Sequence, residues 1–471
     1  MKHAAISLAA AATLASASAA GAVTHDYVVT VDADMQHMQV EARFGTRIDR
    51  IAARSRDAGD FLTNVRNCSN SSDERIRIRN RRMLLPREGL SCLRYSVDLE
   101  KAAAAEQRNA SLSDANIIVS PAAWFWRPEL QGNDEIVVRF ELPDSVSVSV
   151  PWNVVPGEID TYQLLDSPES STAFAAFGKF EFIETDIPGA TLRITLMQAR
   201  DEVQSTNIIK WVRETAANVN LAYGRFPNPS TSVVILPVGG GRWWSDSPVP
   251  FGRVVRDGGE TVELFVNQSR AIDEFYDDWT ATHEFSHLML PYITSRHRWV
   301  SEGFATYYQN ILLARADRYT EERAWQKLWD GFERGRQSRP EMSPNEAARA
   351  GIREATMKIY WSGAAIALLA DVELRQRSSG EESLDTVLDR LQQCCLPSER
   401  TWSGTQLFKK LDSLIEEPVF MPLYRRYANT SGFPDVRPLL SRLGVTVEDG
   451  EVQLQARSEM AAVRSSIMRK P

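Results

Sequence analysis

THEFSHLMLPYITSRHRWVSEGFATYY, residues 282–308, is the stretch around which the rest of the chain is interpreted. It begins with His283, Glu284 and His287 in the pattern H-E-x-x-H. Positions i and i+4 lie on one face of a helix, so both imidazoles can bind one metal ion. Glu284 follows the first histidine and lies beside that ion, where it can accept a proton from a metal-bound water. The pattern therefore predicts a catalytic metal centre.

Glu302, in the second half of the stretch, is the predicted third ligand. Two neutral imidazoles and one carboxylate leave the fourth position of a zinc ion open for water, as catalytic zinc requires. The competing interpretation is a surface helix that carries two histidines and a charge. Two observations favour the metal site: apolar residues flank the motif, and three of the six histidines of the chain fall between 283 and 297.

The two halves together resemble the active site of gluzincin metallopeptidases, most closely the glycyl aminopeptidase family. In that family an H-E-x-x-H helix is followed by a W-x-x-E-G-F helix, which Trp299–Phe304 matches as WVSEGF. The resemblance implies that His283, His287 and Glu302 bind Zn²⁺ and that Glu284 is the general base. Fourteen residues separate His287 from Glu302, fewer than is usual in the related aminopeptidases.

His297 is a rival third ligand. Metzincins place a third histidine after H-E-x-x-H, but they reach it through a glycine turn that this chain lacks. Pro291 ends the first helix soon after His287, and the chain then has room to turn back into a second helix. We therefore expect His297 to be a loop residue.

A second stretch, 360–375, extends the resemblance. Its sequence YWSGAAIALLADVELR begins with Tyr360 in a Tyr-x-x-Gly-Ala pattern. In the resembling families this pattern places a phenol over the zinc, where its O–H stabilises the negative charge that develops on the substrate oxygen. The resemblance thus assigns Tyr360 a catalytic role. The alternative is a tyrosine packed at the start of a helix.

Length and composition point to a multidomain globular protein. The chain has 471 residues, too many for one core, and a net charge of −8, which argues against a nucleic-acid partner. Residues 1–22 have a short basic start and an alanine-rich apolar run, as expected of a signal peptide, and no later stretch is long and apolar enough to span a membrane. We therefore expect export, to a bacterial periplasm or to the medium. The sequence leaves the oligomeric state open.

The four cysteines are compatible with that compartment. Cys68 and Cys92 can pair and link parts of an N-terminal domain. For the neighbours Cys394 and Cys395 three alternatives remain open: a vicinal disulfide, two reduced thiols, or bonds to other partners.

Hydrophobic periodicity divides the chain into an α+β multidomain protein. We expect an antiparallel β-sandwich-like domain over 23–199, a helical domain over 336–445 and a tail over 446–471. For 200–335 the gluzincin resemblance implies a thermolysin-like zinc domain of mixed sheet and helices. Within the second domain, 251–255 and 261–266 predict a hairpin. By the gluzincin resemblance, 261–266 is the edge strand that pairs with substrate backbone. The tryptophans Trp124, Trp126 and Trp152 are predicted to be core or domain-contact residues.

The expected function is therefore that of an exported zinc metallopeptidase acting on a peptide or protein substrate. The G-x-M-E-N motif, with which related aminopeptidases hold the substrate amine, is missing. Acidic residues do occur in the region before His283, but none lies in a sequence similar to G-x-M-E-N; they are Asp246, Asp257, Glu260 and Glu263. Aminopeptidase and endopeptidase both stay open, and the alternative from another class is a non-catalytic peptidase-like envelope protein that binds or assembles. A serine hydrolase is disfavoured because no G-x-S-x-G elbow is present.

Overall fold

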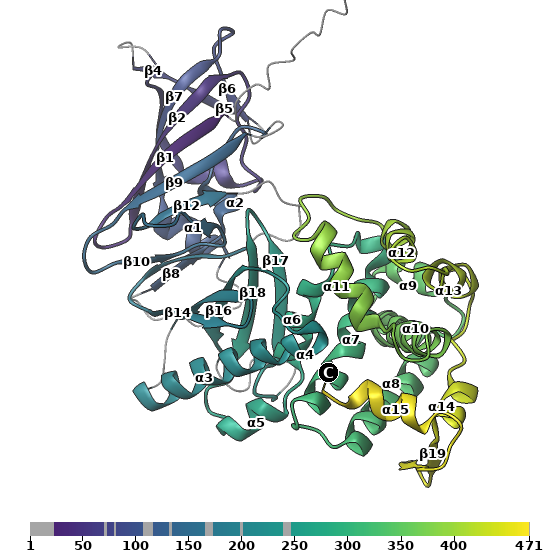
Figure 1. Ribbon diagram of the computed structural model, residues 1–471. Coiled ribbons are helices and arrows are strands. Elements are labelled where there is room, and N and C mark those ends of the chain that lie inside the picture. The colour runs from purple at the N-terminus through teal and green to yellow at the C-terminus, as the bar shows by residue number, and fades with distance from the viewer. Residues whose placement is uncertain are drawn as a thin grey trace, which may run out of the picture.

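The computed structural model describes residues 23–69, 73–79, 82–106, 116–130, 134–164, 173–197, 201–238 and 246–470. The predicted signal peptide, 1–22, lies outside these residues. Strands fill the N-terminal part and helices the C-terminal part, and a second sheet lies between them (Figure 1). No helix in the described ranges has the length and apolar content that a membrane crossing needs.

The N-terminal domain contains two main sheets. The larger has the order β11 (Asn153–Val154), β12 (Thr161–Leu164), β9 (Glu135–Glu141), β1 (Thr24–Val31), β2 (His37–Ile48), β7 (Leu90–Asp98), β3 (Leu62–Asn67) and β4 (Glu74–Arg75). The smaller has the order β10 (Ser147–Ser149), β13 (Ala175–Gly178) and β8 (Asn116–Val119). All pairs are antiparallel except β1 and β9, which run parallel. Shorter elements complete the domain: β5 (Arg77–Arg79), β6 (Arg82–Leu84), α1 (Leu99–Glu106) and α2 (Pro121–Trp124).

Alternating apolar residues explain this sheet. In β1 the side chains of Tyr27, Val29 and Val31 are buried while those between them are more exposed, as the two-residue period of a strand requires. The predicted core tryptophans Trp124, Trp126 and Trp152 are fully buried. Cys68 and Cys92 form a disulfide, and so do Cys394 and Cys395.

The second sheet is mixed, as expected of the zinc domain. Its order is β14 (Glu181–Ile187), β15 (Ala190–Leu196), β16 (Ser230–Pro237), β18 (Glu260–Val266) and β17 (Phe251–Arg256). Strands β15, β16 and β18 are parallel to one another, and the two outer strands are antiparallel to them. The division expected after residue 199 therefore cuts across this sheet, because β14 pairs with β15 and β15 pairs with β16, whereas neither pairs with the strands of the N-terminal sheets.

One expectation about this sheet is wrong. The predicted hairpin forms, but 261–266 lies in β18, which pairs on both sides. Of the two hairpin strands, β17 lies at an edge of the sheet, and β14 forms the opposite edge. The sequence pattern of a hairpin does not show which of its two strands lies at the edge of the sheet, because that depends on which strand pairs with β16.

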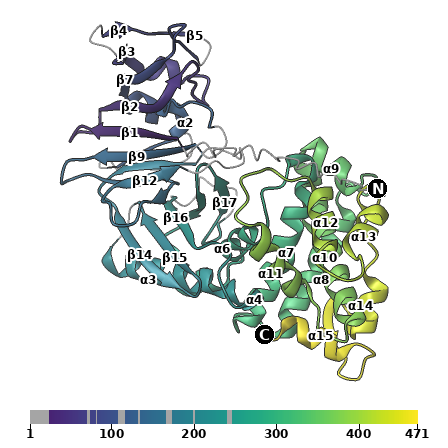
Figure 2. The same ribbon diagram turned by 45° about the horizontal axis from the view of Figure 1, so that its top comes forward.

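Helices make up most of the remainder (Figure 2). They are α3 (Glu202–Asn218), α4 (Asn220–Tyr223), α5 (Ile272–Asp277), α6 (Thr280–Ser286), α7 (Arg298–Arg315), α8 (Glu321–Gln337), α9 (Pro344–Ala350), α10 (Thr356–Arg377), α11 (Leu384–Cys395), α12 (Gly404–Asp412), α13 (Phe420–Tyr427) and α14 (Arg437–Leu443). One continuous apolar core joins the mixed sheet to these helices, so 200–335 and 336–445 do not have separate cores.

The segment 446–471, expected to be a tail, has regular structure within its described part. It contributes most of the hairpin β19 (Val445–Glu448) and β20 (Glu451–Leu454) and all of helix α15 (Ala461–Met468). Ile467 and Met468 are buried in the core shared by the helices. The buried guanidinium of Arg315 also donates a hydrogen bond to the carbonyl of Ile467 at 3.0 Å, which ties the C-terminal helix to α7.

Candidate metal centre

Helices α6 and α7 bring the three predicted ligands together. His283 lies in α6, His287 begins the short 3-10 turn that follows it, and Glu302 lies in the first turns of α7. Pro291 follows this turn, and the chain reverses before α7 starts at Arg298. The fourteen residues between His287 and Glu302 are therefore enough to bring Glu302 beside the two histidines.

The separations of the ligand atoms fit a zinc ion. Oε2 of Glu302 lies 3.3 Å from Nε2 of His283 and 3.5 Å from Nε2 of His287. Two ligands each about 2.1 Å from a tetrahedral zinc ion are about 3.4 Å apart. All three ligand atoms lie within 4.8 Å of one another, and no other such group of His, Cys, Asp and Glu occurs among the residues that the structure describes.

Two further residues orient the imidazoles. Nδ1 of His283 lies 2.8 Å from Oε1 of Gln309, an acceptor oxygen, which favours the neutral tautomer with the proton on Nδ1; in that tautomer Nε2 has the lone pair that a metal ion needs. Nδ1 of His287 lies 3.0 Å from the hydroxyl of Ser301. Such partners fix the ring orientation of metal-binding histidines. The motif did not reveal Gln309, although it follows Glu302 by seven residues and so shares its helix face.

Glu284 occupies the place expected of the general base. Its side chain is buried beside β17, and burial raises the pKa of its carboxyl above the usual value, while His283 and His287 oppose that shift. Gly252 lies against it, since a Cβ at that position would be 2.6 Å from Cγ of Glu284. A glycine inside a strand marks such a close approach. Gly252 is thus a site residue that the sequence patterns missed.

Tyr360 joins the site from α10. Its ring stacks on that of His283, with the centroids 5.6 Å apart and the planes at 11°. Its hydroxyl is hydrogen-bonded to Glu302, whose negative charge, together with burial, raises the pKa of Tyr360 well above its ordinary value. The phenol therefore remains a hydrogen-bond donor beside the ligands.

The rival ligand His297 lies outside the cluster. It belongs to the turn before α7, where its Nδ1 is 3.2 Å from the hydroxyl of Thr294. The acidic residues considered for amine binding are also engaged: each pairs with an arginine, Asp246 with Arg270, Asp257 with Arg54, Glu260 with Arg256 and Glu263 with Arg253.

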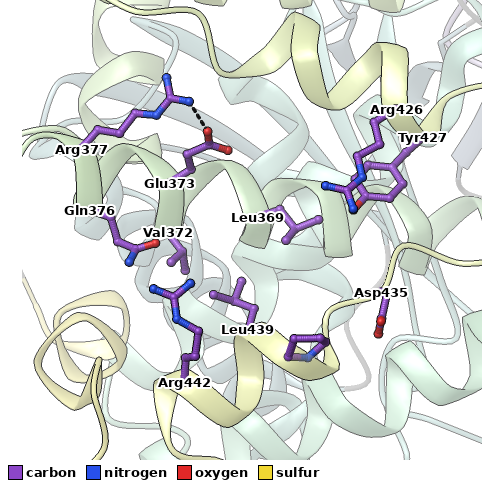
Figure 3. Close-up of a pocket in the computed structure, with 11 residues that line it drawn as sticks. Leu369, Val372, Glu373, Gln376, Arg377, Arg426, Tyr427, Asp435, Leu439 and Arg442 are labelled. Carbon is purple, nitrogen blue, oxygen red and sulfur yellow. Dashed lines mark hydrogen bonds and ion pairs between the residues drawn. The ribbon is translucent and has the colours of Figure 1, made fainter.

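A larger cavity of about 580 Å³ lies away from these residues, between α10, α13 and α14 (Figure 3). Two of its arginines are neutralised, Arg377 by Glu373 and Arg442 by Glu459. Because it contains no ligand or base of the metal centre, we do not assign the chemistry to it.

Comparison with known proteins identifies the fold. No model of a protein family matches the sequence, and no curated protein matches it either. Solved structures do match. An aminopeptidase N family protein from Idiomarina loihiensis is 14% identical with a TM-score of 0.66, and the match covers 90% of this chain and 79% of that one. An M1 zinc metallopeptidase from Deinococcus radiodurans is also 14% identical, with a TM-score of 0.52 and coverage of 88% and 94%.

A further solved structure is a mutant of the Deinococcus radiodurans enzyme bound to a Tyr-Ser-Ala substrate, with 14% identity, a TM-score of 0.52 and coverage of 88% and 96%. The fold expected from the gluzincin resemblance, with a β-rich N-terminal domain, a mixed-sheet domain and a helical C-terminal region, is confirmed. At this identity the likeness establishes the fold, and the chemistry depends on the residues of this chain.

Proposed function

We propose that this chain is an exported, zinc-dependent metallopeptidase that hydrolyses peptide bonds. The observation that carries the proposal is the arrangement of His283, His287 and Glu302 at zinc-ligand separations with Glu284 buried beside them. A zinc ion held by these three residues would polarise the substrate carbonyl and lower the pKa of a water, so that the water can lose a proton and attack the carbonyl carbon. The leader-like segment 1–22 supports export.

The chain's own residues perform the proton transfers. Glu284 accepts the proton of the attacking water and passes it to the nitrogen of the leaving amine. The hydroxyl of Tyr360 donates a hydrogen bond to the carbonyl oxygen as negative charge develops on it. Among the described residues β17 is an outer strand of its sheet and lies against Glu284, so a substrate that pairs with β17 would run past the base.

Aminopeptidase action is the first specific form of the proposal, because the matching structures are named as aminopeptidase N and M1 family proteins. No acidic residue of the four considered is free of an arginine partner, so the residue that would hold a substrate amine is left to experiment. Endopeptidase action is the second form, and it needs no such residue.

The test compares the mature chain with Glu284→Gln on a mixed peptide library, with and without a chelator, read by mass spectrometry. We expect zinc content to stay the same and cleavage to fall by about 10²–10⁴-fold in the variant. Glu381→Gln, at an exposed position, is the matched control.

Loss of single N-terminal residues would establish an aminopeptidase, and internal cuts an endopeptidase. Full activity of Glu284→Gln would refute the mechanism. A chain that neither binds zinc nor cuts any peptide would instead support the non-catalytic envelope protein.

A further inference from the structure

A smaller cavity of about 280 Å³ adjoins the metal centre. Three of its lining side chains contact His283: Tyr360 stacks on the ring, Trp279 meets it edge-on with centroids 5.6 Å apart, and Gln309 accepts its Nδ1 proton. The hydroxyl of Tyr360 also reaches Glu302, so a group bound against the ring of Tyr360 would lie beside the proposed metal centre. The volume is below that of sites for drug-sized ligands and suits one side chain of a substrate.

The mouth of the cavity exposes apolar surface. Trp279 is 44% exposed and Met357 is 37% exposed, and both line it. The aromatic residues Trp361 and Tyr319 also line the cavity. Large hydrophobic side chains that remain exposed together around a hollow mark a binding site more often than chance exposure does. The complementary ligand is a bulky apolar side chain.

Two positively charged side chains of helix α8 also line the cavity. Lys327 and Arg334 lie seven residues apart in α8, hence on one face, and both are exposed. Within the described residues, neither forms an ion pair with a carboxylate. Other arginines of α8 do have such partners: Arg323 pairs with Asp277 and Arg336 with Glu333. In a chain of net charge −8, two cations that lack a carboxylate partner beside an apolar hollow favour a carboxylate ligand.

An unsatisfied buried group lies in the same wall. Thr306 lines the cavity and is 1% exposed, and its hydroxyl has no hydrogen-bond partner among the described residues. Buried hydroxyls without a partner are uncommon in folded proteins, so a polar atom of a ligand is a natural partner here. This observation is independent of the two cations.

We propose that this cavity binds the substrate residue that follows the scissile bond, with a bulky apolar side chain inside it and a carboxylate held by Lys327 and Arg334. The proposal rests on the peptidase function proposed above. The residue after the scissile bond is favoured because the α-carboxylate of a peptide lies on that side. The carboxylate can come from the free C-terminus of a short peptide or from an acidic side chain one residue further on.

Five peptides that begin with alanine separate these contributions: alanyl-phenylalanine, its C-terminal amide, alanyl-alanine, and the amides of alanyl-phenylalanyl-glutamate and alanyl-phenylalanyl-glutamine. We expect kcat/KM about 10- to 100-fold higher for phenylalanine than for alanine in the second position. We expect the free acid to exceed its amide by about 10-fold, or the glutamate peptide to exceed the glutamine peptide by the same factor. Whichever pair differs identifies the source of the carboxylate.

The variant Lys327→Gln/Arg334→Gln should remove the carboxylate preference and leave the phenylalanine preference. Met357→Ala should reduce the phenylalanine preference. The control is Lys409→Gln on α12, which removes the charge of an exposed lysine that does not line the cavity. It should change neither the carboxylate preference nor the phenylalanine preference. The proposal is overturned if wild type cleaves all five peptides equally, or if the double variant loses the same factor on acids and amides.

Binding provides a readout that does not depend on turnover. Calorimetry with zinc-loaded Glu284→Gln should show that alanyl-phenylalanine binds about 10-fold more tightly than its amide, and that the double substitution abolishes the difference. If wild type cleaves no peptide but the preference for binding the free acid is still observed, the proposed peptidase function is overturned and the cavity proposal stands. Equal binding of acid and amide, and of the glutamate and glutamine peptides, would overturn the cavity proposal.

Discussion

At the scale of single residues, the metal centre depends on the partners of its histidines as well as on the ligands. Gln309 accepts the Nδ1 proton of His283 at 2.8 Å inside the protein. We expect Gln309→Leu to weaken zinc binding by about 10- to 100-fold, because the ring loses its orientation and its proton acceptor. Competition with a fluorescent chelator measures this. Gln309→Glu, which keeps an acceptor oxygen, should retain most of the affinity, and unchanged zinc affinity in Gln309→Leu would contradict the assigned role.

Short sequence motifs indicate the three proposed ligands but not the residues that orient them. H-E-x-x-H and W-x-x-E-G-F are short patterns whose chemistry is local, so the placement of His283, His287 and Glu302 followed from the motifs. The contact between His283 and Gln309 joins residues twenty-six positions apart and depends on how α6 packs on α7. Helix periodicity, which puts Glu302 and Gln309 on one face, was the signal that could have indicated it.

At the scale of elements, two glycines allow α7 and α10 to cross closely. A Cβ on Gly303 would lie 2.2 Å from Cα of Gly363, and a Cβ on Gly363 would lie 2.0 Å from the carbonyl oxygen of Trp299. Gly303 follows the ligand Glu302, and Gly363 follows Tyr360 by three residues. The glycines in the two sequence patterns therefore have a packing role: they bring the phenol beside the ligands.

We expect Gly363→Ala to lower the free energy of unfolding by about 1–3 kcal/mol, because the added methyl group would clash with the backbone of α7 and the two helices would have to move apart. It should also reduce activity, since Tyr360 moves with α10. Denaturant titration and peptide cleavage measure the two effects. Gln376→Ala, at an exposed position of the same helix, is the control and should stay within about 0.5 kcal/mol of wild type. Wild-type stability of Gly363→Ala would show that the crossing is not tight.

Elements differ in how far the sequence could predict them. The region 336–445, expected to be helical, contains helices such as α10 and α11, because helical periodicity and a capping serine like Ser383 are local signals. Sheet partners are not local. The parallel pairing of β1 with β9, the position of β17 at the edge and the membership of β15 in the second sheet all depend on strands distant in sequence.

At the scale of the whole molecule, the N-terminal domain packs against the hairpin that borders the active site. Apolar residues of β8 and β13 meet those of β16 and β18 in a small shared cluster. At the hairpin turn, Gly259 approaches the carbonyl oxygen of Pro151 so closely that a Cβ would lie 2.0 Å from it. Asp257 in the same turn is buried, pairs with Arg54 and accepts a hydrogen bond from the backbone N–H of Ala173 at 3.3 Å. The N-terminal domain thus fixes the hairpin whose edge strand lies against Glu284.

This contact predicts that a substitution remote from the metal ligands affects catalysis. Asp257→Ala removes both bonds of a buried carboxylate, which we expect to cost about 1–3 kcal/mol of stability. Because β17 is then held less firmly against Glu284, KM should rise while zinc affinity stays at the wild-type value. Thermal unfolding, peptide kinetics and chelator competition measure these three quantities. Asp246→Ala, which removes an exposed partner of Arg270, is the matched control and should cost less than about 1 kcal/mol. If Asp257→Ala lost stability but kept its KM, the N-terminal domain would support the fold without positioning the edge strand for substrate.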